Sequence, residues 1–257
     1  MKKYALDLVV VEQVMLTPKT SLLKLSCDSP LPPCLPGQFV EMLVEHTPSV
    51  LLRRPISINL IEKEMNRMWL LIQVVGDGSD YLAHLQPGDK VNVLMPLGNG
   101  FTMPDKMGEK VLLVGGGVGC APMACLGLEL EKRGTHVTSL IGARSAADLV
   151  ERDLFERAGR LCITTEDGSQ GEKGFVTNHT VLMERFDRIY SCGPKPMMVA
   201  VARYAQQHDI WCELSLENHM ACGVGACLCC VENTREGNRC VCTDGPVFNR
   251  EDLLWLN

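Results

Sequence analysis

Six of the thirteen cysteines in this chain lie between residues 222 and 242. The segment begins with Cys222-Gly-Val-Gly-Ala-Cys227-Leu-Cys-Cys230, and Cys242 follows after eleven intervening residues. A C-x4-C-x2-C run with a fourth cysteine returning from farther along the chain is the ligand spacing of plant-type [2Fe–2S] sites. The two glycines of the run allow the backbone to wrap closely around a bulky anionic cluster. We therefore expect Cys222, Cys227, Cys230 and Cys242 to bind iron.

A structural zinc site is the alternative for these cysteines, and it would make the chain a zinc-stabilised interaction module without redox activity. Zinc favours two short C-x2–4-C pairs, and the four-residue gap with its glycines departs from that pattern. An iron–sulfur cluster is therefore the better interpretation. Cys229 and Cys240 are left over, and we expect both to be small buried apolar residues.

A glycine-rich turn is the second feature that could do chemistry. It reads Val111-Leu-Leu-Val-Gly115-Gly116-Gly117-Val-Gly119-Cys-Ala121-Pro122. A hydrophobic strand that runs into such a turn at a helix N-terminus presents free N–H groups and a helix dipole to a pyrophosphate. A tight strand–helix connection without a ligand gives the same pattern. This turn is the first of an alternating strand–helix segment, however, and that position favours a dinucleotide site.

Two further elements carry weaker signals. Arg53-Arg54-Pro55-Ile56-Ser57-Ile58 offers an arginine that could clamp a phosphate with two hydrogen bonds, and a hydroxyl that could meet a flavin ring. Val75-Gly76-Asp77-Gly78-Ser79 is a candidate phosphate turn. From the residues alone, the simpler interpretation of the first element is an arginine that lies near a strand and binds no ligand. The second element is equally compatible with a turn that binds no ligand.

The elements that must hold these residues change in character near Met103-Pro104. Before that point, short apolar or alternating runs are separated by turns that contain proline and glycine, which predicts an antiparallel sandwich or barrel. The expected strands are residues 6–11, 22–25, 39–44, 68–75 and 90–94.

After that point strands and helices alternate, which predicts a doubly wound parallel sheet. Asp148, Glu151 and Asp153 are expected to form a solvated helix face, and the last fifty residues are expected to be irregular. The expected strands are residues 110–114, 136–141, 161–164 and 188–191, and the expected helices are residues 121–133, 147–158, 177–185 and 197–208.

Composition limits the class of protein. With 257 residues, 46% hydrophobic and 22% charged, the chain fits two or more globular domains and excludes disordered and fibrous classes. The 25 basic residues are outnumbered by 31 acidic ones and never run longer than a pair, so we expect no nucleic-acid partner. No apolar run has the roughly 18 residues of a membrane span, so no membrane is expected. Thirteen cysteines without a signal peptide indicate metal binding in a reducing cytoplasm.

No nucleophile with a paired base is visible. The six histidines form no triad or ligand spacing, and each is expected to be a surface or capping residue: His46, His84, His136, His179, His208 and His219. We therefore expect no catalytic residue in this chain, since hydride and electron transfer place the chemistry in bound cofactors.

Together these segments resemble the ferredoxin–NADP reductase superfamily. The shared order is a β domain with an R-x-x-S element, a nucleotide domain that opens with G-G-G-x-G-x-A-P and closes with Cys192-Gly193-Pro194, and a C-terminal cysteine segment. Within that superfamily, residues 215–227 and 241–248 resemble the electron transfer subunits of class 1B dihydroorotate dehydrogenase. The resemblance covers nearly the whole chain.

The resemblance implies three domains: an FAD-binding β-barrel over residues 1–103, an NAD-binding α/β domain over 104–210 and a [2Fe–2S] domain over 211–257. It assigns the four cysteines to the cluster, although the return loop before Cys242 is shorter than expected. For FAD it implies Arg54, Pro55, Ile56, Ser57, Leu71, Ile72, Gln73, Gly78 and Ser79. For NAD(H) it implies Gly115, Gly116, Gly117, Gly119, Ala121, Pro122, Cys192, Gly193 and Pro194, with residues 142–144 and 167–169 lining the cleft.

The implied function is that of an oxidoreductase subunit in pyrimidine (UMP) biosynthesis. Electrons would pass from an FMN-bearing dihydroorotate dehydrogenase catalytic subunit through the [2Fe–2S] cluster and FAD to NAD+, in a heterotetramer with two copies of each subunit. The chain alone would not act on dihydroorotate. The alternative enzyme is a related NAD(P)H-linked flavin and iron–sulfur subunit of a ferredoxin or sulfur reductase.

Overall fold

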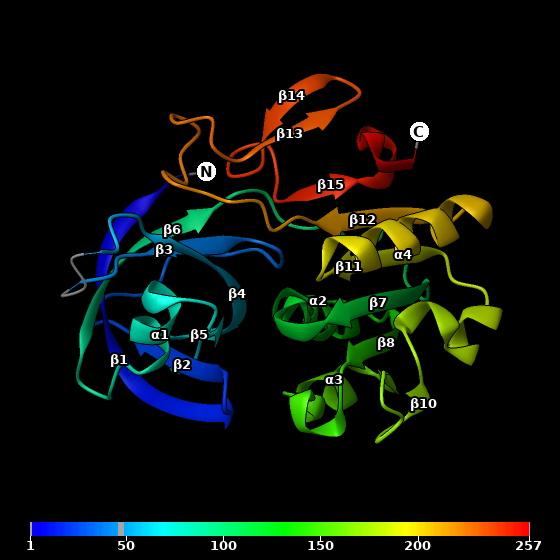
Figure 1. Cartoon of the computed structure of the whole chain (residues 1–257), viewed down its shortest axis with the longest axis horizontal. Coiled ribbons are helices and arrows are strands. Elements are labelled where there is room, and N and C mark those ends of the chain that lie inside the picture. The colour runs from blue at the N-terminus through cyan, green and yellow to red at the C-terminus, as the bar shows by residue number, and fades with distance from the viewer. Residues whose placement is uncertain (1, 46–48, 257) are drawn as a thin grey trace.

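The computed structural model describes residues 2–45 and 49–256. It consists of a β-barrel, a mostly parallel sheet with helices on both faces, and a cysteine-rich segment that lies across one end of both (Figure 1). This architecture confirms the predicted fold class. No helix in the described part of the chain is long and apolar enough to cross a membrane.

The barrel is closed, and all its neighbouring strands are antiparallel, in the order β1-β2-β5-β4-β3-β6. Alternate residues such as Leu23, Val40 and Val93 point into one apolar core, as the period of two in these strands requires. The strands are β1 (Tyr4–Thr17), β2 (Thr20–Ser26), β3 (Phe39–Met42), β4 (Arg54–Glu62), β5 (Arg67–Gln73) and β6 (Lys90–Leu97).

Two elements of the barrel are additional to the expected ones. The segment after Arg53 forms a full strand, β4, and its proline stands near the start, before the pairing with β5 begins at Ile58. The candidate phosphate turn opens a short helix, α1 (Asp77–Ala83). Leu82 and Ala83 of this helix are fully buried and pack against the barrel core.

The second sheet has the strand order β10-β9-β8-β7-β11-β12-β15 and is parallel except for the last pair. Val111 and Leu113 face the helices α2 and α3, whereas Leu112 and Val114 face α4, so this strand is apolar on both sides. The elements are β7 (Lys110–Gly116), α2 (Cys120–Lys132), β8 (His136–Ala143), α3 (Arg152–Ala158), β9 (Arg160–Thr165), β10 (Glu172–Lys173), β11 (Arg188–Cys192), α4 (Lys195–Gln207), β12 (Trp211–Ser215) and β15 (Val247–Asn249).

The structure corrects the predicted helix over residues 177–185. That segment contains two short 3-10 turns, η3 (Val176–Asn178) and η4 (Thr180–Met183). β-Branched residues and an asparagine lower the helix propensity of this stretch, and Asn178 Oδ1 accepts a hydrogen bond from the Phe175 N–H instead. The strands β12 and β15, within the segment expected to be irregular, extend the sheet.

A second correction concerns Glu151, which was expected on a solvated helix face. Its carboxyl group lies against the barrel, where Glu151 Oε2 accepts a hydrogen bond of 2.8 Å from Asn59 Nδ2. Among the histidines, His46 lies outside the described residues. His84 and His208 are C-cap residues and His179 is an N-cap residue, as expected.

The cysteine-rich segment connects the two larger units. It contains a hairpin of β13 (Val231–Thr234) and β14 (Gly237–Cys240). Figure 1 shows that the cysteine-rich segment as a whole lies above β3, β6 and β12. Phe39 and Leu97 of the barrel share one apolar cluster with Cys230 and Cys242. The barrel also contacts the sheet directly, because β4 packs on α2.

Candidate functional site

Arg54 begins β4, and its guanidinium lies over the first turn of α1. A Cβ atom added to Gly78 would stand 2.7 Å from Arg54 Nε and 2.9 Å from Nη2, so glycine leaves the room that the guanidinium occupies. Arg54 Nη1 donates to the carbonyl oxygens of Leu52 at 2.8 Å and Arg53 at 3.2 Å, which fixes the guanidinium plane. A guanidinium held in this way can donate two parallel hydrogen bonds to a phosphate.

The neighbouring Arg53 points toward β3 and β6. Its Nη1 donates to the carbonyl oxygens of Glu41 at 3.2 Å and Asn92 at 3.1 Å, and its Nη2 donates to Asn92 Oδ1 at 2.6 Å. These bonds hold barrel strands together. The two adjacent arginines therefore have different surroundings, and Arg54 is the one that lies at the turn.

Ser57 lies on the outer face of the barrel. It pairs with Phe39 of β3, whose ring belongs to the cluster outside the barrel, while Ile56 pairs with Val40, which points into the barrel. Of the predicted β5 residues, Ile72 is fully buried in the barrel core, so its side chain cannot reach a ligand on the outer face. Leu71 is buried on the other side of the strand, in the cluster that contains α2.

Ser79 stabilises the turn below Arg54. Its Oγ accepts hydrogen bonds from the N–H groups of Val75 at 2.8 Å and Gly76 at 3.1 Å, and donates to the Gly76 carbonyl at 2.9 Å. The hydroxyl is thus occupied within its own turn. Its effect on a ligand would be exerted through the position of Gly78.

The glycine-rich turn and the Cys192-Gly193-Pro194 segment meet at the carboxyl ends of β7 and β11, where Gly115 pairs with Cys192. A Cβ atom on Gly119 would collide with the backbone of Cys192 and Gly193. One on Gly193 would stand 2.9 Å from the Gly116 carbonyl oxygen. The strand order reverses at β7, and such a switch point is where open α/β sheets bind nucleotides.

The loops after β8 and β9 follow the carboxyl ends of the neighbouring parallel strands and contact each other. Asp167 N donates to the Arg144 carbonyl at 3.2 Å, and Ala146 N donates to Ser169 Oγ at 2.8 Å. Asp167 Oδ1 accepts hydrogen bonds from the Ser169 hydroxyl and N–H, at 2.6 Å and 2.9 Å, and these lower the pKa of Asp167. The structure thus brings the two predicted cleft segments together.

Glu217 lies beside the predicted site residue Cys192, and the sequence alone did not point to it. Cys192 Sγ donates to Glu217 Oε1 at 3.8 Å. Although Glu217 is exposed as a residue, the protein atoms around its carboxyl group raise its pKa. A prediction of the strand β12 would have placed Glu217 near Cys192, because Ser215 at the end of β12 pairs with Cys192.

The four predicted cluster ligands lie in one loop region and approach one another as two pairs, Cys222 with Cys227 and Cys230 with Cys242. In residues 2–45 and 49–256, no three His, Cys, Asp or Glu side chains are gathered closely enough to hold a metal ion. Backbone N–H groups point at the sulfurs: Val224 N lies 3.4 Å from Cys222 Sγ, and Cys242 N lies 3.4 Å from Cys230 Sγ.

The same loop favours a thiolate at Cys222. Partial burial opposes ionisation of this thiol, but hydrogen bonds from loop N–H groups outweigh it and lower its pKa to about 6. Burial dominates at Cys242 and raises its pKa to about 12. The expectation that Cys229 is buried is wrong, because this residue is exposed, and Cys240 is only partly buried.

Glu41 of β3 lies directly below the loop. It is 0% exposed, and both its carboxyl oxygens lack a hydrogen-bond partner within the described residues. A Cβ atom on Gly223, whose φ is +65°, would stand 2.7 Å from Glu41 Cγ. Burial raises the pKa of Glu41 to about 7, partly opposed by the nearby Arg53.

Two sets of polar contacts fix the cysteine-rich segment to the rest of the chain. Asn99, after β6, donates from Nδ2 to the carbonyl oxygens of Thr243 at 3.2 Å and Asp244 at 3.1 Å. Glu232 of β13 accepts from Asn218 Nδ2 at 3.0 Å and from Trp255 Nε1 at 2.9 Å. The first set holds this segment against the barrel, and the second joins β13 to the residues that follow β12 and β15.

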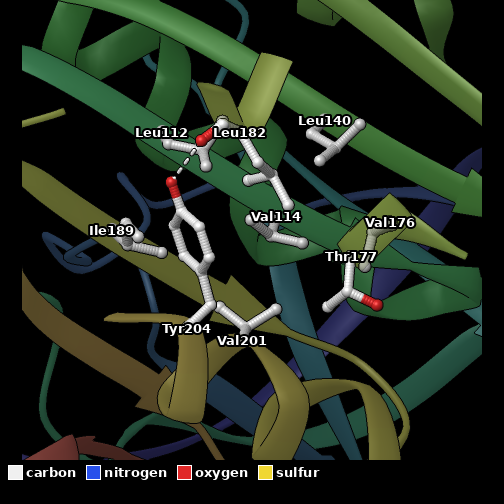
Figure 2. A pocket seen from close by; sticks show the side chains of 9 residues that line it. All are labelled: Leu112, Val114, Leu140, Val176, Thr177, Leu182, Ile189, Val201 and Tyr204. Atoms are coloured by element: carbon white, nitrogen blue, oxygen red, sulfur yellow. Dashed lines mark hydrogen bonds between the residues drawn. The ribbon is translucent and has the colours of Figure 1, made fainter. Parts of the chain in front are cut away.

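A small cavity lies away from these sites, between the sheet and α4 (Figure 2). Its volume is about 10 Å³, which is too small for a ligand and borders on the space of one water molecule. At one end of it Tyr204 Oη donates to the Leu182 carbonyl at 2.6 Å. The cavity is a packing gap in an apolar layer.

Comparison with known proteins identifies the family. The chain is 44% identical over 222 residues to the dihydroorotate dehydrogenase B (NAD(+)) electron transfer subunit of Shouchella clausii, covering 83% of this chain and 84% of that protein. The subunit of the same name from Fusobacterium nucleatum is 34% identical over 255 residues, covering 96% and 97%. This chain belongs to that family. It is an electron transfer subunit of NAD-dependent dihydroorotate dehydrogenase B, an oxidoreductase.

Two further comparisons agree with the family. Residues 217–254 match the iron–sulfur cluster binding domain of dihydroorotate dehydrogenase B, and this range contains all four predicted ligands. A solved structure of an NADH-dependent reduced ferredoxin–NADP oxidoreductase, studied for flavin-based electron bifurcation, superposes with a TM-score of 0.87 and 29% identity. It covers 96% of this chain and 90% of that one. The electron transfer subunit therefore has a flavin reductase fold with an iron–sulfur binding region.

Proposed function

We propose that this subunit binds FAD, one [2Fe–2S] cluster and NAD(H), and passes electrons from a catalytic subunit to NAD+. The observation that carries the proposal is the shared position of the three sites. The cysteine loop rests on Glu41 of β3, β3 pairs with β4, and β4 packs on α2 next to the glycine-rich turn. FAD, when bound, would exchange a hydride with the nicotinamide and single electrons with the cluster.

For the cluster we propose Cys222, Cys227, Cys230 and Cys242 as ligands. Four thiols with N–H groups directed at the sulfurs suit an anionic iron–sulfur cluster. The lowered pKa of Cys222 supports a thiolate at this position. Cys229 and Cys240 remain outside this set.

For FAD we propose that Arg54 binds a phosphate above Gly78, and that Ser57 hydrogen-bonds the flavin ring from the outer face of β4. Pro55 and Ile56 hold these two residues in register. Ser79 supports the turn, and the β5 residues 71–73 contribute through the backbone, because Ile72 points into the barrel.

For NAD(H) we propose that residues 115–122 bind the pyrophosphate at the start of α2. Cys192, Gly193 and Pro194 would lie beside the nicotinamide, and residues 142–144 and 167–169 would line the adjacent rim. The crossing of the two glycine-bearing segments at the switch point supports this assignment.

The assembly we propose is a heterotetramer with two copies of this chain and two copies of an FMN-bearing dihydroorotate dehydrogenase catalytic subunit, at work in pyrimidine (UMP) biosynthesis. We divide the chain into a flavin unit (1–103), a nucleotide unit (104–210) and a cluster unit (211–257), with β12 and β15 of the last unit completing the sheet. Thirteen cysteines, all free thiols in the structure, support a reducing cytoplasmic location.

The test is reconstitution from separate subunits. Purified alone under anaerobic conditions, the chain should carry FAD together with iron and sulfide, and should reduce a dye with NADH. It should oxidise no dihydroorotate until the FMN-bearing subunit is added, after which dihydroorotate should reduce NAD+. Dihydroorotate oxidation by the chain alone would refute the proposal. Turnover with reduced ferredoxin but not with the catalytic subunit would instead favour the ferredoxin reductase alternative.

A further inference from the structure

Asn59 connects the barrel to the nucleotide sheet through one buried side chain. It stands on β4, two residues after Ser57 on the same face, and is 0% exposed. Its Nδ2 donates to Glu151 Oε2 at 2.8 Å and to the Ala121 carbonyl oxygen at 3.2 Å. Ala121 lies in the first turn of α2, and Glu151 directly precedes α3. One amide group therefore joins the proposed flavin strand to the helix start proposed for the nicotinamide nucleotide.

Two oxygen atoms of this pair lack a donor. Asn59 Oδ1 and Glu151 Oε1 are both buried and have no hydrogen-bond partner among the described residues. An amide and a carboxylate share one hydrogen bond, whereas an amide and a carboxylic acid can share two in a closed ring. In that ring the amide N–H donates to one carboxyl oxygen, and the acid O–H donates to the amide oxygen. A proton on Glu151 would supply the donor that these two oxygens lack.

The surroundings of Glu151 favour that proton. Burial raises its pKa to about 7, and the Asn59 hydrogen bond opposes the shift. From α2 it faces the buried Cys120 thiol, whose pKa is raised well above its usual value; from β4 it faces the neutral Asn59. On its own helix, Arg152 pairs with Glu156 at 3.8 Å.

The backbone at Glu151 is also unusual. Its φ of +57° lies in the left-handed region, which is costly for a residue with a side chain and is found where the surroundings enforce it. Here the conformation turns the carboxyl group away from solvent and toward β4. Packing alone would not require a carboxylate at this place.

We propose that Asn59 and Glu151 form a positioning pair that holds the flavin strand against the nucleotide turn, closed by a proton on Glu151 and loosened when that proton leaves. This inference rests on the proposed function, because it assigns the pair to hydride exchange between flavin and NAD(H). Hydride exchange needs reacting atoms about 3–3.5 Å apart, and a misplacement of about 1 Å can cost about a hundredfold in rate.

The test uses three variants of the FAD-loaded chain. Glu151→Gln replaces the acid O–H by an amide N–H, so it should keep both hydrogen bonds at every pH. Asn59→Leu removes both bonds with Glu151, and also the one to the Ala121 carbonyl, with little change in volume. Glu156→Gln is the matched control, because Glu156 is an exposed carboxylate on the same helix. The measurement is the single-turnover rate of flavin reduction by NADH between pH 5.5 and pH 9.

We expect the rate of the wild type and of the Glu156→Gln control to fall about tenfold as the pH rises through neutrality. The Glu151→Gln rate should remain at the low-pH wild-type value throughout. Asn59→Leu should be slower at every pH by about ten- to a hundredfold, with unchanged FAD and iron content. A Glu151→Gln profile parallel to that of the wild type would overturn the proposal, as would an Asn59→Leu rate equal to it.

Urea unfolding of wild type and Glu151→Gln, without NADH, separates this proposal from the proposed function. The wild type should lose stability relative to the variant as the pH rises from 4.5 toward 7, because the folded chain then must give up a proton that it binds more tightly than the unfolded chain does. Parallel unfolding profiles would refute the protonated pair whatever the kinetics show. Failure of NADH to reduce the wild-type flavin at any pH would refute the nicotinamide site, and the unfolding comparison would still decide the pair.

Discussion

A single methyl group at Gly78 should weaken FAD binding while leaving the fold intact. In Gly78→Ala the new Cβ would stand 2.7 Å from Arg54 Nε, so the guanidinium must leave its position over the turn. The obstacle is the end of a flexible side chain, and residue 78 is helical, so alanine is compatible with the backbone there. The predicted damage therefore falls on the phosphate contact.

The size of the effect follows from the lost contact. A charge-assisted hydrogen bond from arginine to a phosphate contributes about 1.5–3 kcal/mol, which corresponds to about ten- to a hundredfold in the dissociation constant for FAD. Arg54→Ala should weaken binding by a similar factor. Arg53→Ala should weaken it less, because Arg53 is engaged with Glu41 and Asn92.

Titration of the flavin-free protein with FAD, followed by flavin fluorescence, measures the effect. Gly76→Ala is the matched control, because no atom lies within 4 Å of its added Cβ and its φ of 174° is ordinary extended backbone. Wild-type FAD affinity in both Gly78→Ala and Arg54→Ala would refute the assignment of Arg54 to the flavin phosphate. Equal weakening in Gly76→Ala and Gly78→Ala would show that the turn, and not the guanidinium, is the sensitive element.

Three further outcomes are expected. Cys242→Ser should lose iron while Cys240→Ser retains it near the wild-type level; metal analysis that finds the reverse contradicts the ligand assignment. Glu41→Gln should unfold at higher denaturant than wild type at pH 8, by up to about 3 kcal/mol, and the difference should vanish below pH 4.5, because a raised pKa costs stability as the pH rises from 4.5 to about 7. Tyr204→Phe should lose about 1 kcal/mol in denaturant unfolding, since the Leu182 carbonyl loses its donor, and unchanged stability would count against that bond.

The fold could be predicted from the sequence because its signals are local. Alternating apolar residues with proline and glycine turns indicated the barrel, and the glycine-rich turn after a hydrophobic strand located the start of α2 within one residue. The helix predicted over residues 177–185 was wrong because only one local signal supported it. The spacing of its apolar residues suits a helix, but the residues between them have low helix propensity. β12 was missed because a five-residue strand next to a cysteine-rich segment carries little pattern of its own.

The residues between the units could not be predicted, since their partners are remote. Asn59 and Glu151 are 92 positions apart, and nothing near either one indicates the other. Glu41 interrupts a buried strand, and only the folded chain shows Gly223 above it. Glu151 was expected on a solvated helix face, and Glu41 drew no expectation from the sequence. Both carboxyl groups instead lie against another unit of the fold.

Their location has a physical reason. Glu41 lies between the barrel and the cysteine loop, and Glu151 lies between the barrel and the second sheet. Glu213 of β12 holds the segment that follows β6, because it accepts hydrogen bonds from Thr102 N at 2.9 Å and Thr102 Oγ1 at 2.6 Å. Apolar surfaces can slide over one another at little cost, whereas a buried hydrogen bond weakens steeply with distance and angle. In the proposed function, electron and hydride transfer would require fixed distances between cofactors that three different units would hold. Buried carboxylates reduce the stability of these junctions at high pH, and in return they define one relative position of the units.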